Sequence, residues 1–276
     1  MLGSTTETLP VEESRCSSLT EGPLPLDTGS SPWDTEGRVD ASGAMAGSPE
    51  RASPDMRGVD ATPLTSAPAW LCASRADGAS TSLMAGSFET IGPREAMEDR
   101  CIVERALWGC EGSLLVGVFD GHRGHEAAEY ARGHFLRHLG ACAGASGAAE
   151  ALREAFLATD LGLRAELDRA WVDRVARMGP SAAWPRQHPG AAAAVALVVG
   201  GEDLWVANAG DCRAVLCRGG CAEALTRDHT AADPAERARV ASVGGTLRSL
   251  HDGWRVGTAT LQVTRSLGDF DAKAGE

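Results

Sequence analysis

Short apolar segments separated by glycine-rich turns stand on both sides of a long helical block, and this order restricts the fold more than any other feature. Residues 113–119 have the length and composition of a buried strand. Apolar residues then recur at helical spacing over residues 125–139 and again over residues 148–175. Consecutive strands segregated from helices are typical of α+β proteins rather than of doubly wound sheets. We therefore expect an α+β sandwich.

Further elements are predicted from composition, turns and caps. Strand-like composition occurs at residues 87–91, 101–103, 194–199, 204–209, 214–217, 254–256 and 261–264. Turns at Gly200 and Gly210 join three of these segments, which we expect to form a meander. Asp233 is a typical N-cap followed by proline, and two glycines follow Val243, so a short helix is predicted over residues 234–243.

The beginning of the chain differs in composition from the rest. Residues 1–83 are rich in Ser, Thr, Pro, Gly and acidic residues and show no sustained periodicity. Such a segment cannot bury enough apolar surface to offset the entropy lost on ordering. We predict a disordered leader over residues 1–83 and one folded domain over residues 84–276.

Charge and cysteine content exclude several classes of protein. The net charge of -12 disfavours nucleic acid or an anionic membrane as a partner. No apolar run is long enough to span a bilayer, and the start of the chain lacks a secretory signal. The eight cysteines are scattered without a CxxC pair, so a disulfide scaffold is not expected. We expect an intracellular monomer in the cytoplasm, the nucleus or both.

Carboxylates at two places next to apolar segments are the first candidates for chemistry. Glu98-Asp99 and Asp120-Gly121 lie where an unpaired charge is expensive to hold. Mg²⁺ and Mn²⁺ prefer such oxygen ligands, and waters complete the octahedron. Asp120 at the end of a buried strand could bridge two ions, and the carbonyl of Gly121 can approach closely because glycine has no side chain. Taken alone, an isolated Asp-Gly pair is better explained by a simple turn.

Two basic residues stand close to these acids in the sequence. The guanidinium of Arg94 could bind a phosphoryl group through two parallel hydrogen bonds, although a surface salt bridge is the alternative. His122 could act as a general acid that protonates a leaving oxygen. Zinc binding by His122 and His125 is the alternative, but no cysteine or further histidine stands nearby to complete a tetrahedral set.

Five segments in this order resemble the motifs of the metal-dependent type 2C protein phosphatases. They are Arg94-x-x-Met97-Glu98-Asp99, Asp120-Gly121-His122-Arg123-Gly124, Ala207-Asn208-Ala209-Gly210-Asp211-Cys212-Arg213, Leu225-Thr226-Arg227-Asp228-His229 and Thr264-Arg265-Ser266-Leu267-Gly268-Asp269-Phe270. The resemblance implies a β-sandwich of mostly antiparallel strands flanked by α-helices. It also implies a protein serine/threonine phosphatase whose partners are phosphoprotein substrates.

The resemblance implies a role for each matching residue. The implied metal-site residues, which bind two Mg²⁺ or Mn²⁺ ions directly or through water, are Asp120, Gly121, Glu98 and Asp99. Arg94 would bind the substrate phosphate, and His122 would be the general acid. The implied supporting residues are Asp211, Arg213 and Asp269. Hydroxide bridging the two metals would attack phosphorus directly, because the metals lower the pKa of water.

Several positions depart from the family pattern. Gly190-Ala191-Ala192-Ala193 lacks the hydroxyl groups usual in that element, which weakens the support of the site. Arg123 replaces a usual glycine, and Cys212 replaces a usual serine. Two later aspartates of the family have no counterpart before Glu276. We therefore expect a truncated domain, incomplete at its C-terminus, and the alternative function is a catalytically inactive phosphatase-like binding or regulatory module.

Overall fold

The structure is a computed structural model, and it describes residues 71, 83–142, 145, 147–179, 188–201, 203–258 and 260–273. The leader predicted over residues 1–83 lies outside the described residues except for Leu71 and Leu83. Leu71 is 1% exposed and packs among the buried residues of the main core.

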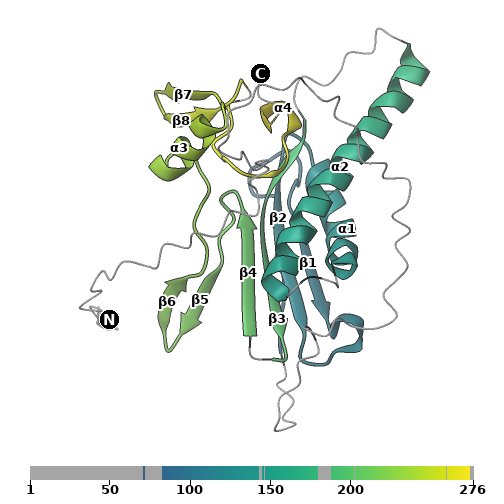
Figure 1. Ribbon diagram of the computed structural model, residues 1–276, viewed down its shortest axis with the longest axis vertical. Coiled ribbons are helices and arrows are strands. Elements are labelled where there is room, and N and C mark those ends of the chain that lie inside the picture. Colours follow the sequence, from purple (N-terminus) through teal and green to yellow (C-terminus); the bar gives the residue numbers. More distant parts are fainter. Residues whose placement is uncertain are drawn as a thin grey trace, which may run out of the picture. The chain divides into compact units, whose positions relative to one another are not determined.

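An antiparallel sheet forms the centre of the described chain (Figure 1). Its strands are β1 (Arg100–Arg105), β2 (Leu114–His122), β3 (Gly190–Val199), β4 (Asp203–Ala209) and β9 (Leu267–Gly268). The order is β1-β2-β3-β4, and β9 pairs with the beginning of β3. These strands confirm four of the predicted segments. β2 extends through His122 instead of ending before Asp120, because Asp120, Gly121 and His122 all pair with β3.

The two predicted helices are confirmed, and both cover one face of this sheet (Figure 1). They are α1 (Glu126–Ala141) and α2 (Ala148–Met178). Phe119 of β2, Phe135 of α1 and Phe156 of α2 are fully buried. The rings of Phe135 and Phe156 meet edge to face, with centroids 5.1 Å apart, so aromatic packing stabilises the contact between the two helices.

The opposite face of the sheet is apolar, and no described helix covers it. Side chains alternate along a strand, so Val116 and Val118 point away from the side on which Phe119 packs. Val118 is 44% exposed, and a cavity of about 460 Å³ lies over this face between β2, β3 and residues 84–88. The strand predicted at residues 87–91 is wrong, because this segment pairs with no strand among the described residues. Asp120 lies on the same face as Val118.

A hairpin follows β4 instead of the third strand of a meander. β5 (Val215–Arg218) pairs with β6 (Cys221–Ala224) and not with β4. Both strands are largely exposed, so they lack an apolar face that could pack in the main sheet. Gly219 and Gly220 both have positive φ, which suits a two-residue hairpin turn. The predicted strand at residues 214–217 exists, but its predicted pairing is wrong.

A short helix and a second hairpin follow β6 in the chain. The predicted helix is confirmed as α3 (Pro234–Ser242), and the side chain of Asp233 caps it by accepting a hydrogen bond from the Ala235 N–H at 2.9 Å. The remaining elements are the hairpin of β7 (Leu247–Leu250) and β8 (Gly253–Val256), the 3-10 turn η1 (Leu107–Gly109) and α4 (Phe270–Lys273). Residues 261–264 form only isolated bridges, so the strand predicted there is wrong.

The described cysteines and helices can be compared with the expectation of no disulfide scaffold and no membrane span. Five described cysteines are free, namely Cys101, Cys142, Cys212, Cys217 and Cys221. Cys110 is disulfide-bonded, an exception to the expected pattern. Among the described residues, no helix has the length and apolar character needed to cross a membrane.

Candidate active site

Strand register brings three carboxylates together at one end of the sheet. Arg100 pairs with Phe119, which pairs with Ala193, which pairs with Ala209. Asp99 precedes the first of these residues, Asp120 follows the second, and Asp211 lies two residues beyond the last. These three aspartates, called the acidic group below, therefore come from β2 and from just outside the ends of β1 and β4.

The pKa of Asp120 shows that the carboxylates of the acidic group lie close enough to interact electrostatically. Burial raises the pKa of the Asp120 carboxyl, and the negative charges of Asp99 and Asp211 raise it further. No lysine or arginine among the described residues forms an ion pair with these carboxylates. A divalent cation would relieve their mutual repulsion.

The donor set fits a hard cation that keeps much of its water. Carboxylate oxygens are the preferred protein ligands of Mg²⁺ and Mn²⁺. Within the described ranges, no three histidine, cysteine, aspartate or glutamate side chains converge closely enough to enclose a metal. An ion at the acidic group would therefore rely on water for several ligands, which is usual for Mg²⁺.

Glu98 and Gly121 hold the loop beside the acidic group. The Glu98 carboxylate accepts a hydrogen bond from the Gly124 N–H at 2.8 Å. A Cβ at Gly121 would lie 2.4 Å from the Glu98 carbonyl oxygen, so only glycine fits there. Glu98 thus contacts the backbone that follows the Asp120-Gly121-His122 segment. Asp99 instead lies close enough to Asp120 for its charge to raise the Asp120 pKa.

The two predicted arginines lie in different surroundings. Arg94 is exposed at a turn in which its N–H bonds the Ile91 carbonyl at 3.2 Å. It has no carboxylate partner among the described residues, so nothing there supports the salt-bridge alternative. Arg213 instead pairs with Asp228 at 2.6 Å and does not contact the acidic group.

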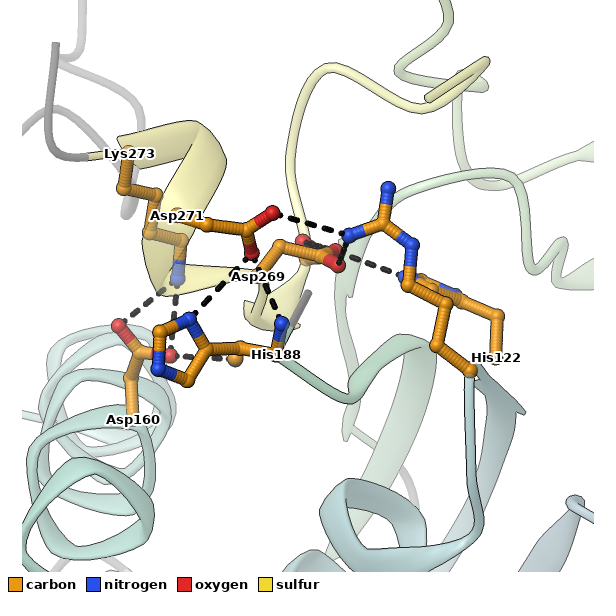
Figure 2. Close-up of polar contacts among 9 residues, drawn as sticks. His122, Asp160, His188, Asp269, Asp271 and Lys273 are labelled. Atoms are coloured by element: carbon orange, nitrogen blue, oxygen red, sulfur yellow. Dashed lines mark hydrogen bonds and ion pairs between the residues drawn. The ribbon is translucent and has the colours of Figure 1, made fainter. Parts of the chain in front are cut away.

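His122 belongs to a second group, which lies next to the acidic one. His122 pairs with Gly190 and Gly190 with Gly268, which places Asp269 near the histidine ring. His122 Nε2 lies 2.8 Å from Asp269 Oδ2 (Figure 2). The Ser266 hydroxyl donates to the same oxygen at 2.5 Å. Burial opposes protonation of His122, but the hydrogen bond and charge of Asp269 together raise its pKa.

Helix α2 anchors the segment that contains Asp269. The Asp160 carboxylate accepts a hydrogen bond from the Lys273 ammonium at 2.8 Å (Figure 2). It accepts another from the Gly268 N–H at 2.8 Å. Asp271 in the same segment accepts a hydrogen bond from the His188 N–H at 3.1 Å. The sequence analysis did not identify Ser266 or Asp271, although both lie within two or three residues of Asp269.

Substitution of Gly190 tests this packing. A Cβ there would lie 2.3 Å from Asp269 Oδ2 and 2.4 Å from His122 Nε2. Gly190→Ala should therefore destabilise the protein by about 1–3 kcal/mol, as overpacking does. Gly133→Ala is the matched control, since nothing lies within 4 Å of its added Cβ, and it should stabilise α1 by about 0.5–1 kcal/mol. Chemical denaturation measures both, and equal effects would contradict the packing of His122 against Asp269.

The thiol of Cys212 provides a chemical test of the acidic group. Burial and the charge of Asp120 raise the pKa of Cys212 to about 12, so almost no thiolate exists at pH 8. We expect iodoacetamide to alkylate the exposed Cys217 and Cys221 well before Cys212. Peptide mapping by mass spectrometry measures the alkylation rate of each of the three cysteines. Cys212 reacting as fast as Cys217 would contradict its placement beside Asp120.

Comparison with known proteins gives consistent results. The family described as Protein phosphatase 2C matches residues 85–276. A "Protein kinase and PP2C-like domain-containing protein" of Arabidopsis thaliana is 44% identical, and the match covers 68% of this chain and 27% of that protein. A "Probable protein phosphatase 2C 47" of Oryza sativa subsp. japonica is 41% identical, with 70% and 49% covered. The chain thus spans between about a quarter and a half of these relatives' length.

A solved structure supports the fold. The serine-threonine phosphatase 2C from Toxoplasma gondii superposes with a TM-score of 0.51 at 18% identity, covering 68% of each chain. At this identity the likeness concerns the fold alone. It agrees with the antiparallel sheet and flanking helices predicted from the sequence.

Proposed function

Because the chain belongs to the protein phosphatase 2C family, we propose that it contributes the catalytic site of a metal-dependent phosphatase acting on phosphoserine and phosphothreonine in proteins. The observation that supports this proposal best is the placement of Asp99 and Asp211 close enough to Asp120, at one end of the sheet, for their charges to raise its pKa. Three neighbouring carboxylates with no lysine or arginine partner among the described residues suit a divalent cation.

Each residue of the candidate site then has a definite role. Asp120, Asp99 and the Gly121 carbonyl would hold Mg²⁺ or Mn²⁺, two ions in the complete site, and Glu98 would hold ordered water next to them. When bound, the metal lowers the pKa of water and supplies a nucleophile near neutral pH. Arg94 would orient the phosphate through its exposed guanidinium. His122 would protonate the seryl or threonyl oxygen as the ester bond breaks.

Hydrolysis of phosphopeptides by the purified chain tests the proposal. We expect phosphate release from phosphoserine and phosphothreonine peptides in the presence of Mn²⁺ or Mg²⁺ and none after chelation with EDTA. A phosphotyrosine peptide is the matched control and should be hydrolysed much more slowly. Release that persists in EDTA, or no release from the chain supplied with Mn²⁺, would refute the proposal.

A second candidate, a phosphatase-like module that binds phosphoproteins without turnover, is favoured by one observation. Ala191 and Ala192 of β3 pair with Gly121 and Asp120, so no hydroxyl group supports the acidic group from that strand. This module would bind a phosphopeptide without releasing phosphate, which fluorescence anisotropy and the same hydrolysis assay distinguish. Mn²⁺-dependent turnover that Asp120→Asn abolishes would exclude it.

A further inference from the structure

Two residues with left-handed backbone face each other next to the His122 ring. Arg123 has φ of 61° and Asp269 has φ of 50°. Side-chain-bearing residues rarely adopt this conformation, and glycine adopts it freely. Such strain persists only where surrounding contacts enforce it, and it is a reason to look for a role in the site.

Arg123 and His122 contact different oxygens of the same carboxylate. Arg123 Nη1 lies 3.4 Å from Asp269 Oδ1 and 3.4 Å from Asp271 Oδ2. Asp269 Oδ2 contacts His122 Nε2 (Figure 2). The same oxygen accepts a hydrogen bond from the Ser266 hydroxyl. Asp269 is 1% exposed, and the Arg123 side chain is 15% exposed. Because both oxygens are engaged, the carboxylate plane has a fixed orientation towards the imidazole.

This orientation determines which ring nitrogen of His122 carries the proton. An ionised carboxylate only accepts hydrogen bonds, so Nε2 must donate to Asp269 Oδ2. In the neutral ring the lone pair therefore lies on Nδ1. Among the described residues, Nδ1 of His122 has no hydrogen-bond partner, which leaves it available for a substrate atom.

We propose that Arg123 and Asp269 are positioning residues that keep the His122 proton on Nε2, so that Nδ1 is the nitrogen that transfers a proton to the leaving oxygen. The transfer step rests on the proposed function, whereas the tautomer does not. In that step the Nδ1–H bond of the imidazolium breaks and an O–H bond forms on the seryl or threonyl oxygen. The neutral imidazole that remains keeps its proton on Nε2.

Asp269→Asn gives the sharpest test because it preserves shape and changes one acceptor into a donor. Arg123 must face the remaining amide oxygen, so the amide NH₂ faces His122 Nε2. The proton of the neutral ring should then move from Nε2 to Nδ1. Long-range ¹⁵N NMR on the chain, at a pH where His122 is neutral, identifies the protonated nitrogen, and His122→Gln assigns its signals.

Arg123→Gly separates positioning from a structural role. Glycine relieves the left-handed backbone, which offsets part of the stability lost with the Arg123 ion pairs to Asp269 and Asp271. The carboxylate loses its fixed orientation, so we expect a mixture of both tautomers. Arg123→Lys should keep Nε2 protonated because it retains a cation, and Arg132→Ala, which removes an exposed arginine of α1, is the control. Protonation of the wild-type His122 ring on Nδ1 would overturn the proposal. So would a His122 ring that stays protonated on Nε2 in both Asp269→Asn and Arg123→Gly.

Kinetics in the active protein test the link to catalysis. Arg123→Gly should lower kcat about tenfold while KM stays within about twofold, because misplacement of a catalytic group affects the transition state most. Unchanged kcat with an altered tautomer would overturn the assignment of Nδ1 as the proton donor. Lack of activity in the wild type would refute the proposed function and leave the tautomer result standing.

Discussion

Asp120→Asn should lower kcat/KM for phosphopeptide hydrolysis by about a thousandfold, since a metal contributes several kcal/mol to charge stabilisation and each 1.36 kcal/mol is a factor of ten. The side chain keeps its shape but loses the charge that Asp99 and Asp211 surround. The folded protein should be as stable as wild type or slightly more so, because repulsion within the acidic group falls. Steady-state phosphate release in Mn²⁺ and thermal unfolding measure the two effects.

The control for Asp120→Asn is Asp203→Asn. Asp203 is exposed at the start of β4 and lies at the far end of that strand from the acidic group. Its substitution should change neither activity nor stability. Activity of Asp120→Asn within tenfold of wild type, at saturating Mn²⁺, would show that Asp120 is not part of the metal site.

Glu236→Gln should destabilise the protein by about 3–5 kcal/mol, the usual cost of leaving a buried charge unpaired. Glu236 is 7% exposed in α3. Its two oxygens accept hydrogen bonds from Arg265 at 2.6 and 2.9 Å, and from the Thr264 hydroxyl at 2.6 Å. The Arg265 side chain is 9% exposed, so loss of the carboxylate charge would strand its cation. Urea denaturation measures the change.

The lowered pKa of Glu236 predicts a dependence of protein stability on pH. Burial raises the pKa of Glu236, but the hydrogen bonds of Arg265, Thr264 and Arg239 outweigh it and hold that pKa far below its ordinary value. A depressed folded-state pKa stabilises the fold above the unfolded pKa of about 4.3, and this contribution is lost as pH falls further. Wild type should therefore lose more stability than Glu236→Gln below about pH 4.3.

Glu150→Gln is the matched control for Glu236→Gln. Glu150 forms an i,i+3 pair with Arg153, and its side chain is 41% exposed. An exposed pair of this kind contributes about 0.3–0.5 kcal/mol. Equal losses for the two variants, or parallel stability curves of wild type and Glu236→Gln through the acid range, would contradict the role given to Glu236.

Periodicity in the sequence predicted the elements that depend on a clear apolar pattern. Helices α1 and α2 and the strand β2 have one, and the structure confirms them. The segment at residues 87–91 has strand-like composition, but strand formation also needs a pairing partner, which composition does not show. The hairpin of β5 and β6 was missed because its signal is the turn at Gly219 and Gly220 rather than an apolar face.

Prediction of the site from the sequence was limited in a different way. Asp120, His122 and Asp99 could be named because each stands next to an apolar strand or in a recognisable motif. Their relation to Asp211 and Asp269 depends on strand register, which joins positions far apart in the chain. The role of Arg123 could not be predicted, since it follows from a left-handed backbone that composition does not show.

Titration of Mn²⁺ into the chain by calorimetry tests the central claim that Asp120 is a metal ligand in a group of acids. Wild type should bind Mn²⁺, and Asp120→Asn should bind it at least about tenfold more weakly, a difference of about 1.4 kcal/mol. Asp203→Asn should bind like wild type. Equal Mn²⁺ affinity of wild type and Asp120→Asn would contradict the account.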